Sequence, residues 1–194
     1  MTLYKNRKSV DGLSVRIGRT FSFLPANVWT ALSLVFVAGS IYFLLEKNFL
    51  PSAFLFAVAS FLDVIDGGVA RHRKEASPFG AYLDTIVDRY VEGAMIIALI
   101  IIALPSFYLP SHWWAAIYLF GSGMVTYAKA AAKEKLDRDV KGGIMERPER
   151  LLLLIAGIVL AYFSQLYLTY VIVALATLTN LTALQRIKIA IGKK

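Results

Sequence analysis

The sequence predicts an all-α polytopic membrane protein with six transmembrane helices and a short N-terminal interfacial helix. Of its 194 residues 58% are hydrophobic and only 18% are charged, and the mean hydropathy is +0.61, which is too apolar for a soluble domain of this length. Three runs without a charged residue, 21–45, 93–128 and 151–185, each exceed the roughly 20 residues that cross a bilayer. The positive charges are also distributed unevenly between the predicted loops.

The N-terminal segment 1–20 is expected to be a cytoplasmic juxtamembrane amphipathic segment, and residues 21–194 a single six-helix membrane domain. Basic and apolar residues alternate irregularly along the first 19 residues, so a surface-lying helix could place the apolar ones in the interface and the basic ones on anionic headgroups. A disordered basic tail is the alternative. No apolar core precedes the first span, so no cleavable signal peptide is expected.

The first three spans are predicted from the hydrophobic runs and their boundary residues. Span one covers about 22–45 and span two about 51–71. Ser77 and Pro78 are typical of a helix N-cap followed by proline at the first helical position, so span three begins there and ends before Pro105.

The second half of the chain is predicted to contain three more spans. Span four covers about 112–133, and the charged, glycine-containing segment 133–150 is a loop. As one helix, the run 151–185 would be about 52 Å long, which exceeds one bilayer crossing. We therefore expect a break near Ser164 and Gln165 and two spans.

The distribution of lysine and arginine predicts the orientation of these spans. With six spans the termini and two loops share one side, and that side carries 19 of the 21 basic residues. The opposite loops carry Lys47 alone, and Arg89 lies within span three. The positive-inside rule therefore places both termini in the cytoplasm of a multi-pass cell-membrane protein. The basic charge is assigned to the membrane surface and to phosphate, and no nucleic acid partner is expected.

A polar stretch, 63–88, interrupts this apolar pattern with four aspartates, three glycines and two arginines. At 100° per residue, the polar or small residues at the end of span two fall within about 140° of arc, and the polar residues at the start of span three within about 80°. Two neighbouring helices therefore present two carboxylates each at a similar membrane depth. The aspartates are Asp63 and Asp66 on the first helix and Asp84 and Asp88 on the second.

Four carboxylates on converging helix faces would repel one another without cations. Two Mg²⁺ or Mn²⁺ ions would supply matching charge, and magnesium favours carboxylate and phosphate oxygens together, so a phosphate-bearing substrate is expected. Gly67 and Gly80 leave room for a ligand, and Arg71 adds a cation for phosphate. The alternative for each glycine is helix packing, and a single intramembrane aspartate could also serve as a proton relay.

The pattern D-x2-D-G-x2-A-R-x8-G-x3-D-x3-D resembles the signature of the CDP-alcohol phosphotransferases. It is matched at every fixed position, by Asp63, Asp66, Gly67, Ala70, Arg71, Gly80, Asp84 and Asp88. The six-span, cytoplasm-facing layout is similar to that family as well.

The resemblance implies a reaction in which an acceptor hydroxyl attacks the β-phosphorus of a CDP-linked lipid and CMP leaves. It implies that Asp63, Asp66 and Asp84 ligate the metals and that Asp88 is both ligand and general base. A carboxylate at the edge of such a cluster is suitably placed to take the proton. The resemblance also implies a homodimer.

The same resemblance implies a cytidine diphosphate site. An N-x-x-T spacing typical of the family is present at the start of span one, but the family's proline-asparagine pair is interrupted, because Ala26 separates Pro25 from the asparagine. The residues expected at the CDP site are Asn27, Thr30, Asp63, Gly67, Ala70, Arg71 and Gly80.

The E-R-x-x-R element at the start of span five is similar to the family's branch that uses inositol phosphate, the phosphatidylinositol-phosphate and archaetidylinositol-phosphate synthases. Two guanidinium groups three residues apart suit an acceptor that carries its own phosphate. A departure is Ala131, where a second basic residue is expected, and Lys133 is the nearest substitute. The residues expected at the acceptor phosphate are Lys129, Arg147, Arg150 and Arg186. Cytoplasmic anchoring is the alternative for all these basic residues.

The predicted function is a phospholipid synthase that transfers a phosphatidyl-type group from CDP-archaeol or CDP-diacylglycerol to inositol 1-phosphate. Glycerol 3-phosphate or serine as the acceptor is the nearest alternative. A divalent-cation transporter is a distant one, because a transporter would place polar positions along several spans on both sides of the midplane. The expected partners are the CDP-linked lipid, a phosphorylated polar alcohol and membrane lipids.

Overall fold

The computed structural model describes residues 17–73, 75, 77–140 and 142–192. Over this part of the chain the regular secondary structure is helical, apart from an isolated β-bridge between Phe107 and Leu109. The chain divides into two compact units, one ending at Met95 and the other beginning at Ile96. The predicted all-α class is confirmed.

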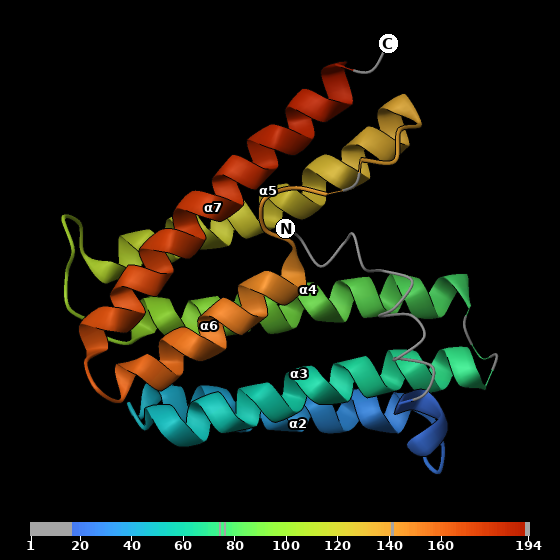
Figure 1. Ribbon diagram of the computed structural model, residues 1–194, viewed down its shortest axis with the longest axis horizontal. Helices are drawn as coiled ribbons and strands as arrows, with labels where there is room; N and C mark the ends of the chain where they lie inside the picture. Colours follow the sequence, from blue (N-terminus) through green and yellow to red (C-terminus); the bar gives the residue numbers. More distant parts are fainter. Residues whose placement is uncertain (1–16, 74, 76, 141, 193–194) are drawn as a thin grey trace. The chain divides into compact units, whose positions relative to one another are not determined.

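The first unit contains α2 (Ala26–Leu45), α3 (Phe49–His72) and most of α4 (Pro78–Ile101). Helices α2 and α3 pack side by side as an antiparallel pair (Figure 1). Small polar residues let them approach closely at one point, where the buried Ser40 hydroxyl donates a hydrogen bond of 2.9 Å to the backbone oxygen of Ser52. These bounds agree closely with the predicted spans one to three.

An apolar cluster joins α2 to the end of α3 that carries the aspartates. Its buried members are Trp29, Leu62, Ile65 and Val69. Because Ile65 and Val69 are 1% and 0% exposed, they hold one face of α3 against α2. This contact fixes the aspartate-bearing end of α3 against α2.

Segment 17–24, which precedes α2, packs on the same end of α3. Its residues 17–20 are helical, and a Cβ added to Gly18 would lie 2.2 Å from the backbone carbonyl of Gly68. Only a residue without a side chain allows this backbone contact. Arg73 donates a hydrogen bond to the backbone oxygen of Ser22, and the Trp29 indole donates one of 3.1 Å to that of Phe21. The rest of the predicted N-terminal interfacial helix lies outside the described residues.

The start of α4 is fixed by the predicted cap. The Ser77 hydroxyl accepts a hydrogen bond of 3.0 Å from the backbone N–H of Gly80, and Pro78 is the first helical residue. This bond satisfies one of the N–H groups that a helix start leaves without a partner. The cap places Asp84 and Asp88 on the second and third turns.

The second unit contains α5 (Ser111–Leu136), α6 (Arg147–Ala161) and α7 (Gln165–Gly192). Helix α7 packs against both α5 and α6 (Figure 1). Gly121 permits the first contact, since a Cβ there would lie 2.4 Å from the Thr179 hydroxyl. The predicted break in the last hydrophobic run is confirmed, because α6 ends at Ala161 and α7 begins at Gln165.

Three of these helices are long and apolar enough to cross a membrane, namely α2, α3 and α7. The chain is a membrane protein with at least these three candidate spans among its described residues. Helices α4 and α5 carry more charge, and α6 has 15 residues, about 22 Å of helix. Length and composition therefore identify three candidate spans, and the count of six stays a prediction.

Candidate active site

Three aspartates from α3 and α4 lie together at one end of the first unit. One carboxylate oxygen each from Asp63, Asp66 and Asp84 lies within 4.8 Å of the other two. Around an octahedral Mg²⁺ neighbouring oxygens are about 3.0 Å apart and opposite ones about 4.2 Å, so the three would have to draw closer together to share one divalent cation. The carboxylate donor set and its spacing therefore suit a divalent metal.

The three carboxylates differ in exposure. Asp66 is 6% exposed, Asp63 is half-buried and Asp84 is exposed. Asp66 is buried because α2 covers it, whereas the start of α4 leaves Asp84 open to approach from outside. A ligand would therefore reach the cluster from the side of Asp84.

Thr30 of α2 fixes the orientation of Asp66. Its hydroxyl lies 2.6 Å from Oδ2 of Asp66 and donates a hydrogen bond to it. The same hydroxyl also lies 3.2 Å from the backbone oxygen of Ala26. The Thr30 side chain was predicted to contact CDP, and its bond to Asp66 was not foreseen. The sequence signal for this bond was a threonine near the start of the neighbouring helix, at the same end of the helix pair as Asp66.

Gly67 and Arg71 lie one turn apart at the end of α3. A Cβ added to Gly67 would lie 3.5 Å from a terminal nitrogen of Arg71, an ordinary van der Waals distance. The guanidinium group therefore lies over Gly67, the residue that follows Asp66. Because the protein itself would tolerate a methyl group at Gly67, a requirement for glycine there would come from a ligand.

The remaining predicted donor-site residues occupy the same ends of the helices. Asn27 is exposed on the first turn of α2, Ala70 is half-buried on α3, and Gly80 is exposed on the first turn of α4. Asp88 is half-buried one turn beyond Asp84, and it does not belong to the three-carboxylate group defined by the described residues. The roles of these residues stay predictions.

An ion pair in α4 was missed by the sequence analysis. Glu92 is 2% exposed and accepts a hydrogen bond of 2.8 Å from the Arg89 guanidinium, three residues earlier. The signal was present, since Glu92 continues the i, i+4 row of Asp84 and Asp88. Within an apolar helix this pairing compensates a charge that would otherwise be costly.

The predicted acceptor residues all lie in the second unit. Arg147 and Arg150 are one turn apart at the start of α6, half-buried and 1% exposed respectively, and Lys129 is exposed on α5. Arg186 on α7 is 7% exposed, and its guanidinium bonds the backbone oxygens of Gly142 and Val125 at 3.0 and 2.8 Å. Arg186 therefore holds two backbone segments together, and its contact with the acceptor phosphate stays a prediction.

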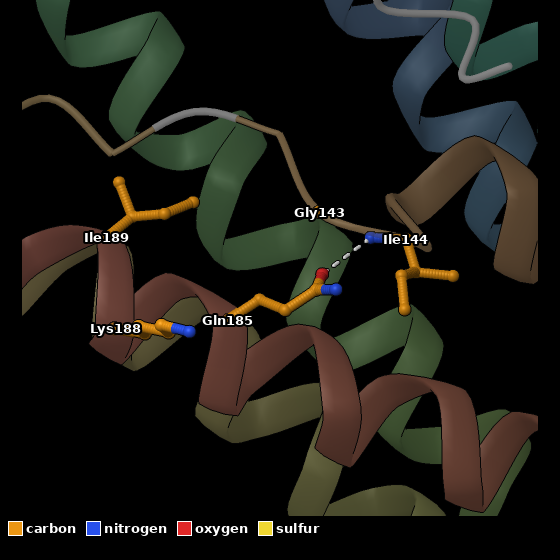
Figure 2. A pocket seen from close by; sticks show the side chains of 5 residues that line it. All are labelled: Gly143, Ile144, Gln185, Lys188 and Ile189. Atoms are coloured by element: carbon orange, nitrogen blue, oxygen red, sulfur yellow. Dashed lines mark hydrogen bonds between the residues drawn. The ribbon is translucent and has the colours of Figure 1, made fainter.

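A cavity of about 430 Å³ opens between the end of α7 and the loop before α6. Figure 2 shows Gln185 reaching across to the backbone of Ile144, with Lys188 and Ile189 further along the same helix. The lining is mainly apolar, with Lys188 as its cation.

A family model for CDP-alcohol phosphatidyltransferases matches residues 23–182 of the chain. This range includes α2, α3 and α4 with the aspartate cluster, and most of α7. The chain belongs to the CDP-alcohol phosphatidyltransferase family. The resemblance drawn from the aspartate pattern is thereby confirmed.

Relatives within this family are similar over nearly the whole chain. The archaetidylinositol phosphate synthase of Methanothermobacter thermautotrophicus is 30% identical over 181 residues, which are 93% of this chain and 87% of the relative. A crystal structure of the Mycobacterium tuberculosis phosphatidylinositol phosphate synthase with CDP-DAG bound has a TM-score of 0.79 and 29% sequence identity, and the match covers 91% of this chain and 92% of that one. The fold is thus that of a phosphatidyltransferase enzyme.

A second structure of the mycobacterial synthase was solved in complex with manganese and citrate. It has a TM-score of 0.78 and 27% identity, covering 91% of this chain and 88% of that one. Together with the three-carboxylate group, this complex supports a divalent metal for the phosphatidyltransferase described here.

Proposed function

We propose that this chain transfers a phosphatidyl-type group from a CDP-linked lipid, CDP-archaeol or CDP-diacylglycerol, to the hydroxyl of inositol 1-phosphate and releases CMP. The observation that carries the proposal is the convergence of Asp63, Asp66 and Asp84 within the family signature. The relatives named archaetidylinositol phosphate and phosphatidylinositol phosphate synthases support the acceptor.

In the proposed reaction the acceptor hydroxyl oxygen forms a bond to the β-phosphorus of the donor. The bond from that phosphorus to the bridging phosphoanhydride oxygen breaks, and CMP leaves with the electron pair. Asp88, at the edge of the cluster on α4, takes the hydroxyl proton. No oxidant or further reactant is needed.

The metal proposal is two Mg²⁺ ions, with Mn²⁺ as the other cation that suits the carboxylates. Asp63, Asp66, Asp84 and Asp88 would hold them, and when bound they would neutralise the pyrophosphate and stabilise charge on the leaving CMP. The residues proposed to bind the donor's CDP portion are Asn27, Thr30, Asp63, Gly67, Ala70, Arg71 and Gly80. The small residues among them give space, and Arg71 offers a fixed cation to phosphate.

The acceptor proposal assigns its phosphate to the second unit. Arg147 and Arg150 would bind it from the start of α6, with Lys129 and Arg186 as further cations. In this proposal residues 21–194 act as one catalytic membrane domain with six spans. The termini and the site face the cytoplasm, since the lysine and arginine bias favours that side, and the enzyme is a homodimer.

The acceptor is tested by measuring CMP release from the purified enzyme with a CDP-linked lipid and each alcohol in turn. We expect release with inositol 1-phosphate at least about tenfold faster than with inositol, glycerol 3-phosphate or serine, because only the first combines the inositol ring with a phosphate for the arginines. Release with serine or glycerol 3-phosphate but none with inositol 1-phosphate would refute the acceptor and leave the family reaction intact.

Thr30→Val is expected to weaken Mn²⁺ binding about tenfold, since the variant keeps the shape of the side chain but loses the hydroxyl that orients Asp66. Electron paramagnetic resonance of free Mn²⁺ during a titration measures this affinity without turnover. Thr30→Ser keeps the hydroxyl and is the matched control. Equal Mn²⁺ affinity in all three proteins would show that Thr30 does not act through the metal ligand.

A further inference from the structure

The loop between α5 and α6 leads directly into the two arginines proposed to bind the acceptor phosphate. Helix α5 ends at Leu136, and α6 begins at Arg147. Between them, the described residues 137–140 and 142–146 have no regular structure, and Gly142 and Gly143 have positive φ angles of 84° and 144°. A loop of this kind needs contacts from elsewhere to hold the start of α6 in one place.

Helix α7 supplies these contacts through three neighbouring side chains. The backbone N–H of Ile144 donates a hydrogen bond of 3.1 Å to the Gln185 side-chain oxygen, as Figure 2 shows. One residue further, the N–H of Met145 donates one of 3.1 Å to the Thr182 hydroxyl. The loop is therefore bonded at consecutive backbone positions.

The third side chain, Arg186, holds the two ends of the same short segment. Its Nε donates to the backbone oxygen of Gly142, and a terminal nitrogen lies 3.7 Å from a carboxylate oxygen of Glu146. Glu146 is the residue immediately before Arg147. The ion pair therefore fixes the point at which α6 begins.

Steric contact adds to these bonds. A Cβ added to Gly143 would lie 2.4 Å from the Thr182 methyl carbon, so the loop backbone lies directly on α7. Thr182 is fully buried and Met145 is 7% exposed. Gln185 is only half-buried and borders the cavity beside Ile144, so its side chain can be changed with little effect on the packed residues.

We infer that Thr182, Gln185 and Arg186 position the arginines at the start of α6, and that Gln185 is a positioning residue for the acceptor phosphate which does not touch the acceptor itself. This inference rests on the proposed function, because it requires that Arg147 and Arg150 bind that phosphate. Gln185 acts only by holding Ile144, and through it the segment that ends at Arg147.

The test compares Gln185→Leu with Gln185→Glu in the purified full-length enzyme. The leucine variant cannot accept the hydrogen bond from Ile144, so the KM for inositol 1-phosphate should rise about three- to tenfold while the KM for the CDP-linked lipid stays within about twofold of wild type. The glutamate variant keeps an acceptor oxygen and should resemble wild type.

The two variants separate positioning from direct contact. If the Gln185 side chain touched the acceptor, the negative charge of Gln185→Glu would repel the phosphate and raise the acceptor KM above that of Gln185→Leu. That result would overturn the inference. So would a Gln185→Leu enzyme with an unchanged acceptor KM, or one in which the KM values of both substrates rise together.

Arg147→Ala distinguishes a failure of this inference from a failure of the proposed function. If Arg147→Ala raises the acceptor KM and Gln185→Leu does not, only the positioning role is refuted. If Arg147→Ala leaves the acceptor KM unchanged, the proposed phosphate site is wrong, and the inference falls with it.

Spin labelling gives a readout that does not depend on turnover. The chain has no cysteine, so Pro148→Cys provides one labelling site at an exposed position on the first turn of α6. The nitroxide should be more mobile in Gln185→Leu than in Gln185→Glu. Equal mobility in the two proteins would show that Gln185 does not hold this segment.

Discussion

Replacing Asp66 by asparagine is expected to lower the rate of CMP release about a thousandfold. The substitution removes one negative charge from a group of three carboxylates whose oxygens lie within 4.8 Å of one another. Metal ions supply several kcal/mol of charge stabilisation to reactions at phosphorus, and each 1.36 kcal/mol corresponds to a factor of ten in rate. CMP release and Mn²⁺ affinity, measured on the same preparation, should fall together.

Asp137→Asn is the matched control for this variant. Asp137 is an exposed aspartate at the end of α5 with a φ of 48°, a conformation that asparagine also tolerates. Its partner Lys133 is exposed too, and surface ion pairs contribute little to stability. CMP release should therefore be unchanged. An Asp66→Asn enzyme with full activity, or one that keeps wild-type Mn²⁺ affinity, would contradict the metal proposal.

Asp88→Asn is expected to lower CMP release by about 10²- to 10⁴-fold, the usual contribution of a positioned general base. Asp88 lies one turn beyond Asp84 on α4 and outside the three-carboxylate group, so its loss should affect the proton transfer more than nucleotide binding. Calorimetric titration with CMP in the presence of Mg²⁺ measures the second property. We expect CMP affinity within about tenfold of wild type.

The comparison of the two variants separates the roles of the aspartates. Asp66→Asn should lose metal and CMP binding as well as turnover, whereas Asp88→Asn should lose turnover and keep CMP affinity within about tenfold of wild type. If Asp88→Asn retained turnover, Asp88 would not be the base. If it lost CMP binding to the same degree as Asp66→Asn, its main role would be that of a metal ligand.

Helix boundaries were predictable because they depend on short stretches of sequence. The Ser77–Pro78 cap, the break before Gln165 and the loop before Arg147 all follow from residues within a few positions of the boundary. The pairing of Asp63 and Asp66 with Asp84 was predictable for a related reason. The aspartates share helix faces by their spacing, and a short connection keeps the two helices adjacent.

Contacts between residues distant in sequence were not predictable. The bond from Thr30 to Asp66 depends on the rotation of α2 relative to α3, and the burial of Arg186 depends on where the loop before α6 lies. A hydrophobic pattern fixes which face of a helix is apolar, but it does not fix the depth or angle at which two helices pack. The roles assigned to Thr30 and Arg186 from sequence alone therefore omitted their protein contacts.

The amino-acid sequence alone determined that this is a helical membrane protein with an acidic, glycine-containing signature of the CDP-alcohol phosphatidyltransferases, since composition and residue spacing are local properties of the chain. Only the tertiary structure decided which carboxylate is buried, that Thr30 bonds it, and that α7 holds the segment leading to Arg147. Those features arise from the packing of one helix on another, which is set by the shapes of many side chains acting together.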